Sequence, residues 1–532
     1  MALPAWLDPL FDAEEMGAAD AFATSERGVP SLELMERAGE GLARVAVEVA
    51  DAGGRTGAIR VVIGKGNNGG DGLVAARVLR ERGREVEVLS TAPLDELRGD
   101  AATNLEHLPG DAPVEGADAD LLSGSAAVID ALLGTGFAGE PREPVAGAIA
   151  AINDSEAPVV ACDVPSGVDA ATGEVEGDAV RAVATATFHA PKIGLHVAPG
   201  ALHAGDVHPL EIGIPREAPS AAGAGLISDR VLELVPSRTR AGSKFDAGTV
   251  VVAGGMRGLT GAPTMAALAA MRTGAGYVQL AVPESTETVF ALKLLEAMTA
   301  GQPEADGTHS EAGADGVAQL AERAGAIVVG PGIGSSEGAV AFARATAERI
   351  EVPLLIDADG LNAHAGALEI LRDRRAPTVL TPHAGELARL LETDSASVAA
   401  RRLASAREAA ERSGSIVVLK GDDTIVAAAE GLVAVSRGGS PSLATAGTGD
   451  VLSGVIAAFL AKGLDAFAAA AAGVLAHARA GRVAAARFGA DHTIASDVID
   501  AVPAGLRGPA TARERRAAEG APDAGPARRI SR

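Results

Sequence analysis

The 532-residue chain is poor in three kinds of side chain. It contains one cysteine, Cys162, only 2% aromatic residues, and six lysines among 46 basic residues. A single cysteine excludes an internal disulfide framework and a zinc site built from cysteines. So few aromatic rings argue against stacking platforms for single-stranded nucleic acid. The cores must therefore consist mainly of Val, Ile, Leu and Ala.

Positive charge and long apolar runs are also lacking. The 46 Lys and Arg are outnumbered by 70 Asp and Glu, which gives a net charge of −24. Such acidity argues against nucleic acid or an anionic membrane as a partner. The apolar runs at 451–461 and 466–478 are shorter than the ~20 residues that a membrane-spanning helix needs, and the first residues lack a basic export signal. We therefore expect a cytoplasmic protein.

Two long stretches alternate short Val/Ile-rich runs with helical patterns, which is typical of parallel sheets built from βαβ units. In the first, the pattern predicts a helix at 31–50 and strands at 59–63, 85–89, 127–129, 159–163 and 183–188. In the second, it predicts helices at 263–273 and 338–348 and strands at 249–252, 277–282, 326–329, 353–356, 378–380, 415–419 and 424–428. The predicted division is a domain at 1–215, a linker at 216–225, a domain at 226–507 and a disordered tail at 508–532.

A glycine-rich motif, GKGNNGGDG at residues 64–72, follows the first of these strands. Gly64, Gly66 and Gly69 have the G-x-G-x-x-G spacing of a dinucleotide-binding loop. Asp71 argues against that function, because its carboxylate would repel a pyrophosphate at the helix N-terminus. The amides, carboxamides and carboxylate of the motif instead suit a ligand together with an alkali cation. A capped strand-to-helix turn is the alternative.

Two later strands also end in polar residues. Asp130 is followed by the glycine-rich ALLGTGFAGEPREP, and Asp163 begins DVPSGVD, which contains Ser166. The carboxyl ends of parallel strands face a common crevice, so we expect these residues to converge with Asn67 to Asp71. Cys162 should point away from Asp163 by strand alternation and belong to the core.

Together, GKGNNGGDG, IDALLGTGFAGEP and DVPSGVD resemble the NAD(P)H-hydrate epimerase domain over about residues 10–214. The resemblance implies a Rossmann-like three-layer αβα domain that interconverts the R and S epimers of hydrated NADH and NADPH. It implies that Asp163 is the acid/base residue and contacts the hydrate. The other implied hydrate contacts are Asn67, Asn68, Gly69, Gly70, Asp71, Gly134, Thr135, Gly136, Phe137, Ala138, Gly139 and Glu140.

The same resemblance implies a potassium ion. Asn68, Asp130 and Ser166 match its ligands, and their oxygen atoms suit that ion. Lys192, in FHAPKIGLH, matches a recurrent lysine of the family, but the sequence does not explain its role.

The second stretch contains a motif for phosphoryl transfer, AGTGD at residues 446–450, which opens a long apolar helix. The amides of Gly447, Thr448 and Gly449 at a helix N-terminus would form an anion hole for a phosphoryl group. Asp450 beside them is placed to take a proton from a substrate hydroxyl. A Walker A lysine motif is absent, so the chain is not a P-loop protein.

GPGIG, LTPHAGE, KGDDT and GTGD, in this order, resemble the ADP-dependent NAD(P)H-hydrate dehydratase domain over about residues 225–505. The resemblance implies a ribokinase-like αβα fold, and ADP and Mg²⁺ for converting the S hydrate to NADH or NADPH with release of AMP and phosphate. The implied hydrate contacts are Ala262, Gly332, His383 and Asp450. The implied nucleotide contacts are Lys420, Gly421, Asp422, Asp423, Thr424 and Gly449.

The leading hypothesis is therefore an epimerase fused to an ADP-dependent dehydratase, with Asp163 and Asp450 as the catalytic residues. We also expect a homo-oligomer whose partners are small molecules. Three alternatives remain: an NAD-linked dehydrogenase that uses the first glycine motif, a small-molecule kinase with an accessory domain, and a non-enzymatic ligand-binding first domain. Asp71 argues against the first alternative, the pairing of GTGD with GKGNNGGDG against the second, and Asp130, Asp163 and Ser166 together against the third.

Overall fold

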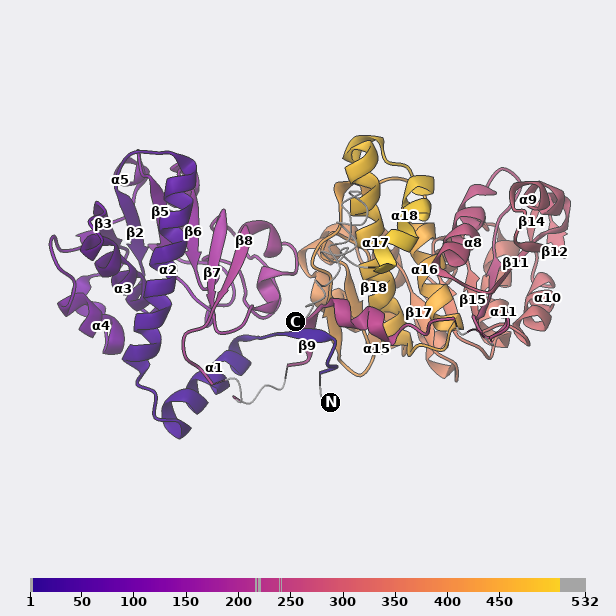
Figure 1. Cartoon of the computed structure of the whole chain (residues 1–532), viewed down its shortest axis with the longest axis horizontal. Helices are drawn as coiled ribbons and strands as arrows, with labels where there is room; N and C mark the ends of the chain where they lie inside the picture. Colours follow the sequence, from indigo (N-terminus) through magenta and orange to yellow (C-terminus); the bar gives the residue numbers. More distant parts are fainter. Residues whose placement is uncertain (1–2, 216–217, 219–221, 239, 241, 508–532) are drawn as a thin grey trace, which may run out of the picture.

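The chain forms two halves that lie side by side along the long axis of the molecule (Figure 1). The computed structural model describes residues 3–215, 218, 222–238, 240 and 242–507. Each half is built around one largely parallel sheet with helices packed on it, so the predicted α/β class is confirmed. The predicted tail at 508–532 lies outside the described residues.

The sheet of the first half has seven parallel strands in the order β4-β3-β2-β5-β6-β7-β8. Their bounds are β2 (Ile59–Ile63), β3 (Val86–Ser90), β4 (Val114–Glu115), β5 (Ala127–Ala131), β6 (Val159–Cys162), β7 (Ala184–Phe188) and β8 (Asp206–Leu210). The strand order reverses between β2 and β5, so the carboxyl ends of these two strands flank a crevice. The five predicted strands are present, with ends within two residues of the prediction.

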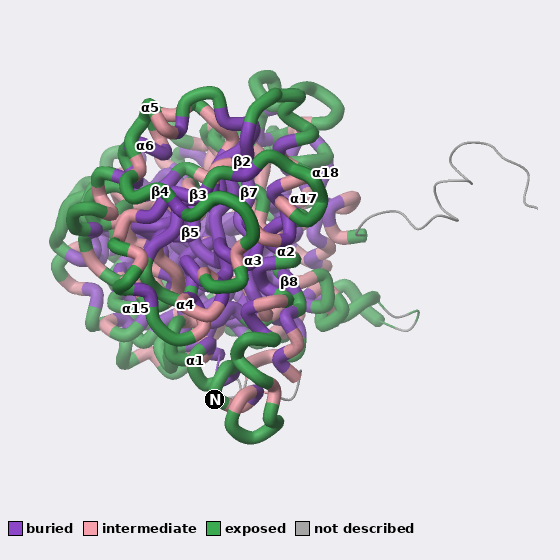
Figure 2. Tube along the Cα trace, turned by 90° about the vertical axis from the view of Figure 1, so that its left-hand side faces the viewer, coloured by how far each residue is buried: buried purple, intermediate pink, exposed green. Residues whose placement is uncertain are grey.

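Helices cover both faces of this sheet and bury two separate hydrophobic clusters. Their bounds are α2 (Ser31–Gly53), α3 (Asn67–Glu81), α4 (Gly99–Glu106), α5 (Ala119–Leu122), α6 (Val145–Asp154) and α7 (Ala201–Ala204). Figure 2 shows the central strands of this half, such as β5 and β7, buried beneath the helices and loops. Helix α3 begins at Asn67, earlier than expected. The predicted glycine loop is therefore largely the first turn of a helix.

The second half contains an eleven-stranded sheet in the order β1-β9-β20-β19-β18-β17-β16-β15-β10-β11-β12. The bounds are β1 (Leu7–Leu10), β9 (Ala224–Ile227), β10 (Thr249–Ala253), β11 (Tyr277–Pro283), β12 (Met298–Gln302), β15 (Ala326–Val329), β16 (Leu354–Ile356), β17 (Thr378–Leu380), β18 (Ile416–Leu419), β19 (Ile425–Ala427) and β20 (Val433–Val435). A separate hairpin pairs β13 (Glu304–Ala305) with β14 (Thr308–His309). The order reverses between β10 and β15, which creates a second switch-point crevice.

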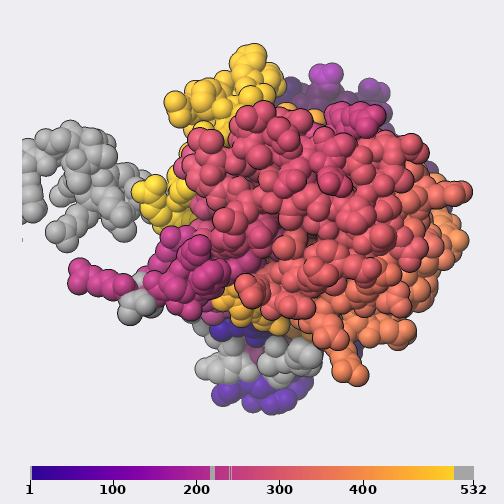
Figure 3. Space-filling model, turned by 90° about the vertical axis from the view of Figure 1, so that its right-hand side faces the viewer, coloured from indigo at the N-terminus to yellow at the C-terminus, as the bar shows by residue number. Residues whose placement is uncertain are grey.

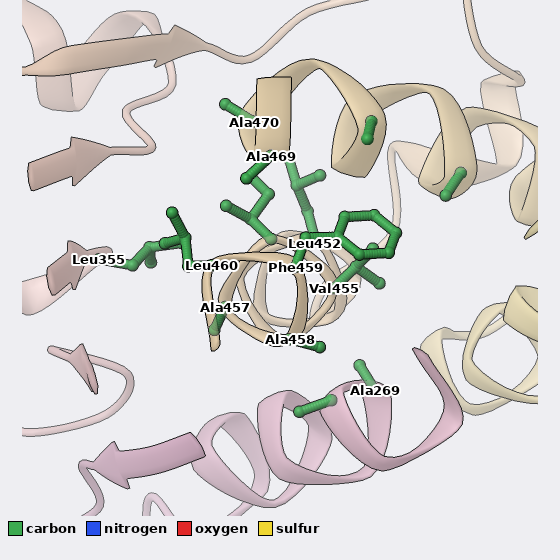
Figure 4. Close-up of a cluster of buried hydrophobic side chains, with 14 of the residues drawn as sticks. Ala269, Leu355, Leu452, Val455, Ala457, Ala458, Phe459, Leu460, Ala469 and Ala470 are labelled. Carbon is green, nitrogen blue, oxygen red and sulfur yellow. The ribbon is translucent and has the colours of Figure 1, made fainter. Parts of the chain in front are cut away.

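Helices also cover this sheet on both faces. Their bounds are α8 (Gly261–Thr273), α9 (Glu287–Lys293), α10 (Gly313–Ala321), α11 (Glu337–Arg349), α12 (Asp359–Ala363), α13 (Ala384–Leu390), α14 (Ser395–Ala400), α15 (Arg402–Ser413), α16 (Thr448–Ala461), α17 (Ala466–Phe488) and α18 (Ala495–Arg507). Helix α16 lies in the core between α8 and α17, where its Val455 and Phe459 are fully buried (Figure 4). Gly454 permits the close crossing with α8, because a Cβ there would lie 2.1 Å from the Ala266 carbonyl oxygen.

The first strand of the chain does not belong to the first half. Residues Leu7–Leu10 form β1, which pairs antiparallel with β9 at the end of the second sheet. In Figure 1 the N-terminus lies beside β9, and the chain then crosses to α1 (Ala13–Ala21) in the first half. The predicted division at residues 1–215 missed this strand, because LDPL is short and interrupted by Asp and Pro. The predicted linker also ends earlier, since β9 already begins at Ala224.

The far end of the second half is formed by α9 and the edge strand β12. Figure 3 views the molecule from this side, and the segment around residue 300 lies on the face shown. Four apolar side chains are exposed here, Val289, Leu292, Leu295 and Met298. Within the described ranges, no helix is both long and apolar enough to cross a membrane.

Candidate active sites

A cavity of about 870 Å³ opens at the switch point of the first sheet. Its volume lies within the ~300–1,000 Å³ that is usual for small-molecule sites. Eight of the predicted hydrate contacts line it: Asn67, Asn68, Asp71, Gly134, Thr135, Gly136, Phe137 and Asp163. The other five lie outside the lining: Gly69, Gly70, Ala138, Gly139 and Glu140. The predicted convergence of three strand ends on one site is thus present in the structure.

The glycines of the first motif allow close packing. A Cβ on Gly69 would lie 2.0 Å from the Gly64 carbonyl oxygen, and one on Gly64 would lie 2.3 Å from the Leu132 carbonyl oxygen. Real Cβ atoms do not approach so closely, so these positions require glycine to seat α3 against the ends of β2 and β5. The packing brings Asn67, Asn68 and Asp71 to the cavity wall.

Asp163 sits at the edge of the cavity in a buried ion pair with Lys192. The Lys192 ammonium, which is fully buried, donates to Asp163 Oδ1 at 2.5 Å, to Thr187 Oγ1 at 3.1 Å and to the Phe188 carbonyl at 2.8 Å. All three of its donors are therefore satisfied. The pair explains the lysine that the sequence left without a role: it holds the Asp163 carboxylate in place and compensates its charge.

The backbone around Asp163 also fixes its direction. Asp163 has φ 66°, in the left-handed region, and the Val164 amide donates to the Cys162 carbonyl across it at 2.8 Å. Such a tight three-residue turn is strained for a residue with a side chain. Among the described residues, the hydrogen bonds to this carboxylate are all made to Oδ1, by the Thr187 hydroxyl, the Phe188 amide and the Lys192 ammonium. This arrangement leaves Oδ2 available to a molecule in the cavity.

Asp71 is the second carboxyl group of this cavity. It is 8% exposed, and burial raises its pKa well above the usual value, with Asp163 and Asp20 raising it further. Its environment thus favours the protonated form, while Asp163 next to it is paired with an ammonium. Two carboxyl groups in such different surroundings are a common arrangement for acid/base chemistry.

Asn68, Asp130 and Ser166 meet around the peptide of Leu133. Asn68 Nδ2 donates to the Leu133 carbonyl at 2.8 Å, the Leu133 amide donates to Ser166 Oγ at 2.9 Å, and Ser166 Oγ donates to Asp130 Oδ1 at 2.6 Å. Asp130 is fully buried, and burial raises its pKa to about 6 with no cationic side chain among the described residues offsetting it. A buried carboxylate beside amide, hydroxyl and carbonyl oxygens fits a potassium ion.

The second site lies at the N-terminus of α16. Gly447 precedes this helix with φ 92°, and none of the side chains that the structure describes caps its first amides. Asp450 lies in the first turn, where burial and then the neighbouring Asp357 raise its pKa to about 7, while Lys420 lowers it. A carboxyl group with such a pKa can accept a proton near neutral pH. The predicted anion hole and base therefore lie together.

Lys420 connects this helix with the strand ends. Its ammonium lies 3.1 Å from Asp357 Oδ1 and 3.6 Å from Glu386 Oε2, and a Cβ on Gly449 would be 3.5 Å from it. Ser453 Oγ donates to the other Asp357 oxygen at 2.7 Å. Lys420 is thus placed beside the anion hole, as a phosphate-binding lysine would be.

Asp357 and Glu386 are the nearest carboxylates to this lysine, and they test whether a magnesium ion fits. Among the described residues, no group of three or more His, Cys, Asp or Glu side chains is assembled for a metal ion. Mg²⁺ usually takes one or two carboxylates and completes its shell with phosphates and water. The two carboxylates beside Lys420 fit such a shared site.

His383 serves as a helix cap. Its Nδ1 accepts from the Gly385 amide at 3.0 Å, and Glu386 Oε2 accepts from the His383 amide at 2.8 Å, which completes a capping box for α13. Nδ1 as acceptor implies that the proton is on Nε2. Gly332 packs against the loop before α8, with a Cβ there 2.9 Å from the Leu259 carbonyl oxygen, and Ala262 lies in the first turn of α8. Both therefore lie at the second switch point.

Asp423 differs from the rest of the predicted nucleotide motif. Its two oxygens form a bidentate ion pair with Arg402 at 2.7 and 2.8 Å, and Oδ2 also accepts from the Ala198 amide of the first half at 2.9 Å. Thr424 Oγ1 donates to the Gly421 carbonyl at 2.5 Å. Asp423 is thus engaged in a contact between the halves, whereas Gly421 and Asp422 are exposed.

The comparisons with known proteins match both halves of the chain to families. The family described as YjeF-related protein N-terminus matches residues 31–194, and the family described as NAD(P)H-hydrate dehydratase matches residues 250–504. The bifunctional NAD(P)H-hydrate repair enzyme Nnr of Salinibacter ruber is 41% identical over 481 residues, covering 85% of this chain and 88% of that protein. The enzyme of the same name from Moorella thermoacetica is 39% identical over 465 residues, covering 84% of this chain and 87% of that protein. The chain belongs to the bifunctional NAD(P)H-hydrate repair enzyme family.

Solved structures resemble the second half of this family member. The ADP/ATP-dependent NAD(P)H-hydrate dehydratase of Bacillus subtilis aligns with a TM-score of 0.46 and 24% identity, over 53% of this chain and 97% of that one. A ribokinase-like superfamily protein of Enterococcus faecalis aligns with a TM-score of 0.47 and 25% identity, over 55% and 98%. The family membership confirms the resemblance drawn from the motifs.

Several residues of the repair-enzyme sites escaped the sequence reasoning. Asp357 comes directly after the strand predicted at 353–356, and Glu386 lies in LTPHAGE, but neither residue was given a role. Ser453 was read only as part of an apolar helix. Asp357 follows a predicted strand and Glu386 lies in the first turn of a helix, but their partner Lys420 is distant in sequence, as Asp357 is from Ser453.

Proposed function

We propose that this chain repairs hydrated NADH and NADPH in two steps, with the first half interconverting the R and S hydrates and the second half dehydrating the S hydrate. The observation that carries this proposal is the pairing of two crevices in one chain. One contains Asp163 held by Lys192 beside Asp71, and the other contains Asp450 beside Lys420 and the free amides of α16.

In the first half, we propose that Asp163 moves a proton at the hydroxyl of the hydrated ring carbon. That carbon is bonded to the ring nitrogen, so its C–O bond can break as the nitrogen lone pair forms a C=N bond. Protonation of the departing hydroxyl releases water, and addition of water to the opposite face gives the other epimer. Asp71 and the loop Gly134–Phe137 line the same cavity and would contact the hydrate.

Potassium would be held by Asn68, Asp130 and Ser166, together with the Leu133 carbonyl. Its charge would compensate the buried Asp130 carboxylate and orient oxygen atoms of the substrate. The convergence of these groups on one peptide supports the assignment. Replacing potassium with a small organic cation in the assay should lower epimerisation, while ADP-dependent repair of pure S hydrate continues.

In the second half, we propose that Asp450 takes the proton of the hydrate hydroxyl while its oxygen attacks the β-phosphorus of ADP. AMP leaves, and the phosphate ester then loses phosphate from the ring carbon and a proton from the adjacent carbon, which restores the reduced nicotinamide. Lys420 and the α16 amides stabilise the transferring charge. Ala262, Gly332 and His383 would contact the hydrate.

The nucleotide would lie along Lys420 to Thr424 and Gly449, with Mg²⁺ shared between its phosphates and the carboxylates of Asp357 and Glu386. We propose ADP as the phosphoryl donor. Steady-state comparison of ADP with ATP on pure S hydrate tests this choice, and a clear preference for ATP would contradict it.

The two-step repair is tested by incubating the full chain with mixed R and S NADPH hydrates and ADP, and following the absorbance of reduced nicotinamide. Recovery of both epimers, faster than spontaneous epimerisation supplies S hydrate, is expected. Repair that stops after the S fraction would leave the first half without its proposed activity. Absence of recovery from pure S hydrate would remove the proposed activity of the second half.

We also propose that the chain assembles with copies of itself. The edge strand β12 and the exposed Leu292, Leu295 and Met298 support a subunit contact at the far end of the second half. Light scattering coupled to size exclusion should give more than one chain mass, and Leu295→Glu should reduce it. A cytoplasmic location is proposed because the hydrates arise from the reduced cofactors of metabolism, and a fluorescent fusion tests it.

A further inference from the structure

Residues 3–26 form a segment that reaches the first cavity from outside the matched family region, which begins at residue 31. After β1, the Phe11 amide donates to the Pro191 carbonyl at 3.0 Å, and the Ile193 amide donates to the Phe11 carbonyl at 3.2 Å. Phe11 thus lies beside the backbone of Lys192. The chain then enters helix α1 and a π-helical turn, η1 (Phe22–Glu26).

This segment supplies a wall of the epimerase cavity. Met16, Asp20 and Thr24, spaced one helical turn apart, all line it. The start of the segment is fixed by contacts on both sides: Asp12 and Glu15 form a capping box for α1, and β1 is paired in the second sheet. The wall is therefore a constant part of the cavity, held by a strand of the other half.

Asp20 is the charged residue of this wall. Its side chain is solvent-accessible, as the lining of an open cavity should be, and its carboxyl group interacts electrostatically with Lys192 and Asp163. Burial against the cavity raises its pKa above the usual value, although Lys192 lowers it. Asp20, Asp71 and Asp163 thus surround one cavity, from helix α1, helix α3 and the end of strand β6.

Epimerisation places two demands on proton carriers. The R and S hydrates carry their hydroxyl groups on opposite faces of the ring, so one carboxyl group in one position can serve only one face. When one carboxyl group protonates the departing hydroxyl, the C–O bond breaks and water leaves as the ring nitrogen forms the C=N bond. Water then adds to the other face, its oxygen bonds to the carbon, and its proton passes to a second group. Over the two steps one water leaves and one water adds, while the first carboxyl group gives up one proton and the second group takes one up.

We propose that Asp20 is this second proton carrier and serves the face of the ring that Asp163 does not reach. All three carboxyl groups line the cavity, but from different elements: Asp163 follows strand β6, Asp71 lies in α3 and Asp20 lies in α1. Its access to solvent lets it recover its protonation state after each turnover. The epimerase site of this chain therefore includes a catalytic residue from a segment that is tied to the dehydratase half.

The test uses Asp20→Asn in the full chain, with pure R hydrate and no ADP, so that only epimerisation proceeds. Chromatographic measurement of S hydrate, after subtraction of the spontaneous rate, should show kcat lowered by about 10²-fold with KM within about twofold of the original. Asp20→Glu should restore part of kcat because it keeps the carboxyl group. Glu14→Gln, on the same helix but outside the cavity lining, is the matched control and should leave kcat unchanged.

The integrity of each variant is read from ADP-dependent repair of pure S hydrate, which should stay at the original rate. A kcat for Asp20→Asn within about twofold of the original, or a loss confined to KM, overturns the proposal. If Asp20→Asn loses S-hydrate repair as well, Asp20→Ser and Asp20→Glu carry the test: equal kcat for these two variants contradicts a proton carrier. A lower kcat for Asp20→Ser than for Asp20→Glu supports it.

Discussion

The two halves share one strand order but use it differently. In both, the first strand lies at the centre, the second and third follow on one side, and the fourth to seventh follow on the other: β2 to β8 in the first half, and β10, β11, β12, β15, β16, β17 and β18 in the second. In both, an aspartate follows the fifth strand and pairs with a lysine, Asp163 with Lys192 and Asp357 with Lys420.

The surroundings of these two pairs decide their functions. Lys192 is fully buried with three partners and cannot reach a ligand, so its aspartate is the group that faces the cavity. In the second half the exposure is reversed: Asp357 is 2% exposed, and the side chain of Lys420 is 21% exposed, with its ammonium beside Gly449. The same strand-end pair therefore presents a carboxylate in one half and an ammonium in the other. The second half needs a separate base, and α16 provides it as Asp450.

The difference between the two halves is tested most strongly by removing the base of the second half alone. Asp450→Asn should lower ADP-dependent repair of pure S hydrate by about 10²–10⁴-fold, because a general base is lost. Nucleotide binding, measured by calorimetry, should persist, and epimerisation of R hydrate should be unchanged. Near-normal turnover of S hydrate would contradict the assignment.

Removing the buried ammonium of the first half should affect stability most. Lys192→Met leaves the buried Asp163 charge without a partner, which typically costs about 3–5 kcal/mol of folding free energy. Urea unfolding followed by circular dichroism measures this loss. The double variant Lys192→Met with Asp163→Leu removes both charges and should regain most of the stability without epimerase activity. If the single and the double variant are equally stable, the loss of stability does not come from an unpaired Asp163 charge.

Asp163→Asn tests the facing carboxylate itself. We expect epimerisation of R hydrate to fall by about 10²-fold, while S-hydrate repair stays intact because distant sites usually act independently. The rate must be taken above the spontaneous background. If the variant epimerises R hydrate at the wild-type rate, Asp163 has only a structural role. A parallel loss of S-hydrate repair would indicate coupling between the halves.

The smallest expected effect is on pH dependence. Because Asp450 must be ionised to act as a base and its pKa is raised to about 7, kcat/KM for dehydration should rise with pH below this value and level off above it. The slope should approach tenfold per pH unit. Stopped assays with pure S hydrate at constant ionic strength measure it. A kcat/KM that does not change between about pH 5.5 and 8 would contradict the raised pKa of Asp450.

The central strands were readable from sequence because strands buried on both faces are nearly continuous in Val, Ile, Leu and Ala. Edge strands were not, since β1, β8 and β12 mix Asp, His, Pro or Thr with few apolar residues. The early start of α3 was missed because glycines were read as a loop, although here they permit a close approach of helix and strands. Propensity is a weak guide where tertiary packing decides.

The convergence of the strand-end motifs could be predicted from the sequence, whereas the side-chain pairs that join two motifs could not. Asn67, Asp71 and Asp163 line one cavity, as the rule of strand carboxyl ends predicts. The link from Lys192 to Asp163, or from Lys420 to Asp357, depends on which strands are neighbours and on side-chain reach. Asp423 matched a nucleotide motif, yet Arg402 and the Ala198 amide occupy both its oxygens, a contact that only the arrangement of the halves reveals.

The pairing of β1 with β9 also bears on how the chain is made. Leu7–Leu10 leaves the ribosome on the order of 200 residues before Ala224–Ile227, so at ~5–20 residues per second it waits roughly 10–40 s for its partner. The strands of the first sheet are synthesised during this interval and are all present before β9 emerges, while β1 is still without its partner strand. The epimerase half is thus an insertion within the dehydratase sheet, and its cavity gains a fixed wall only when synthesis has reached the second half.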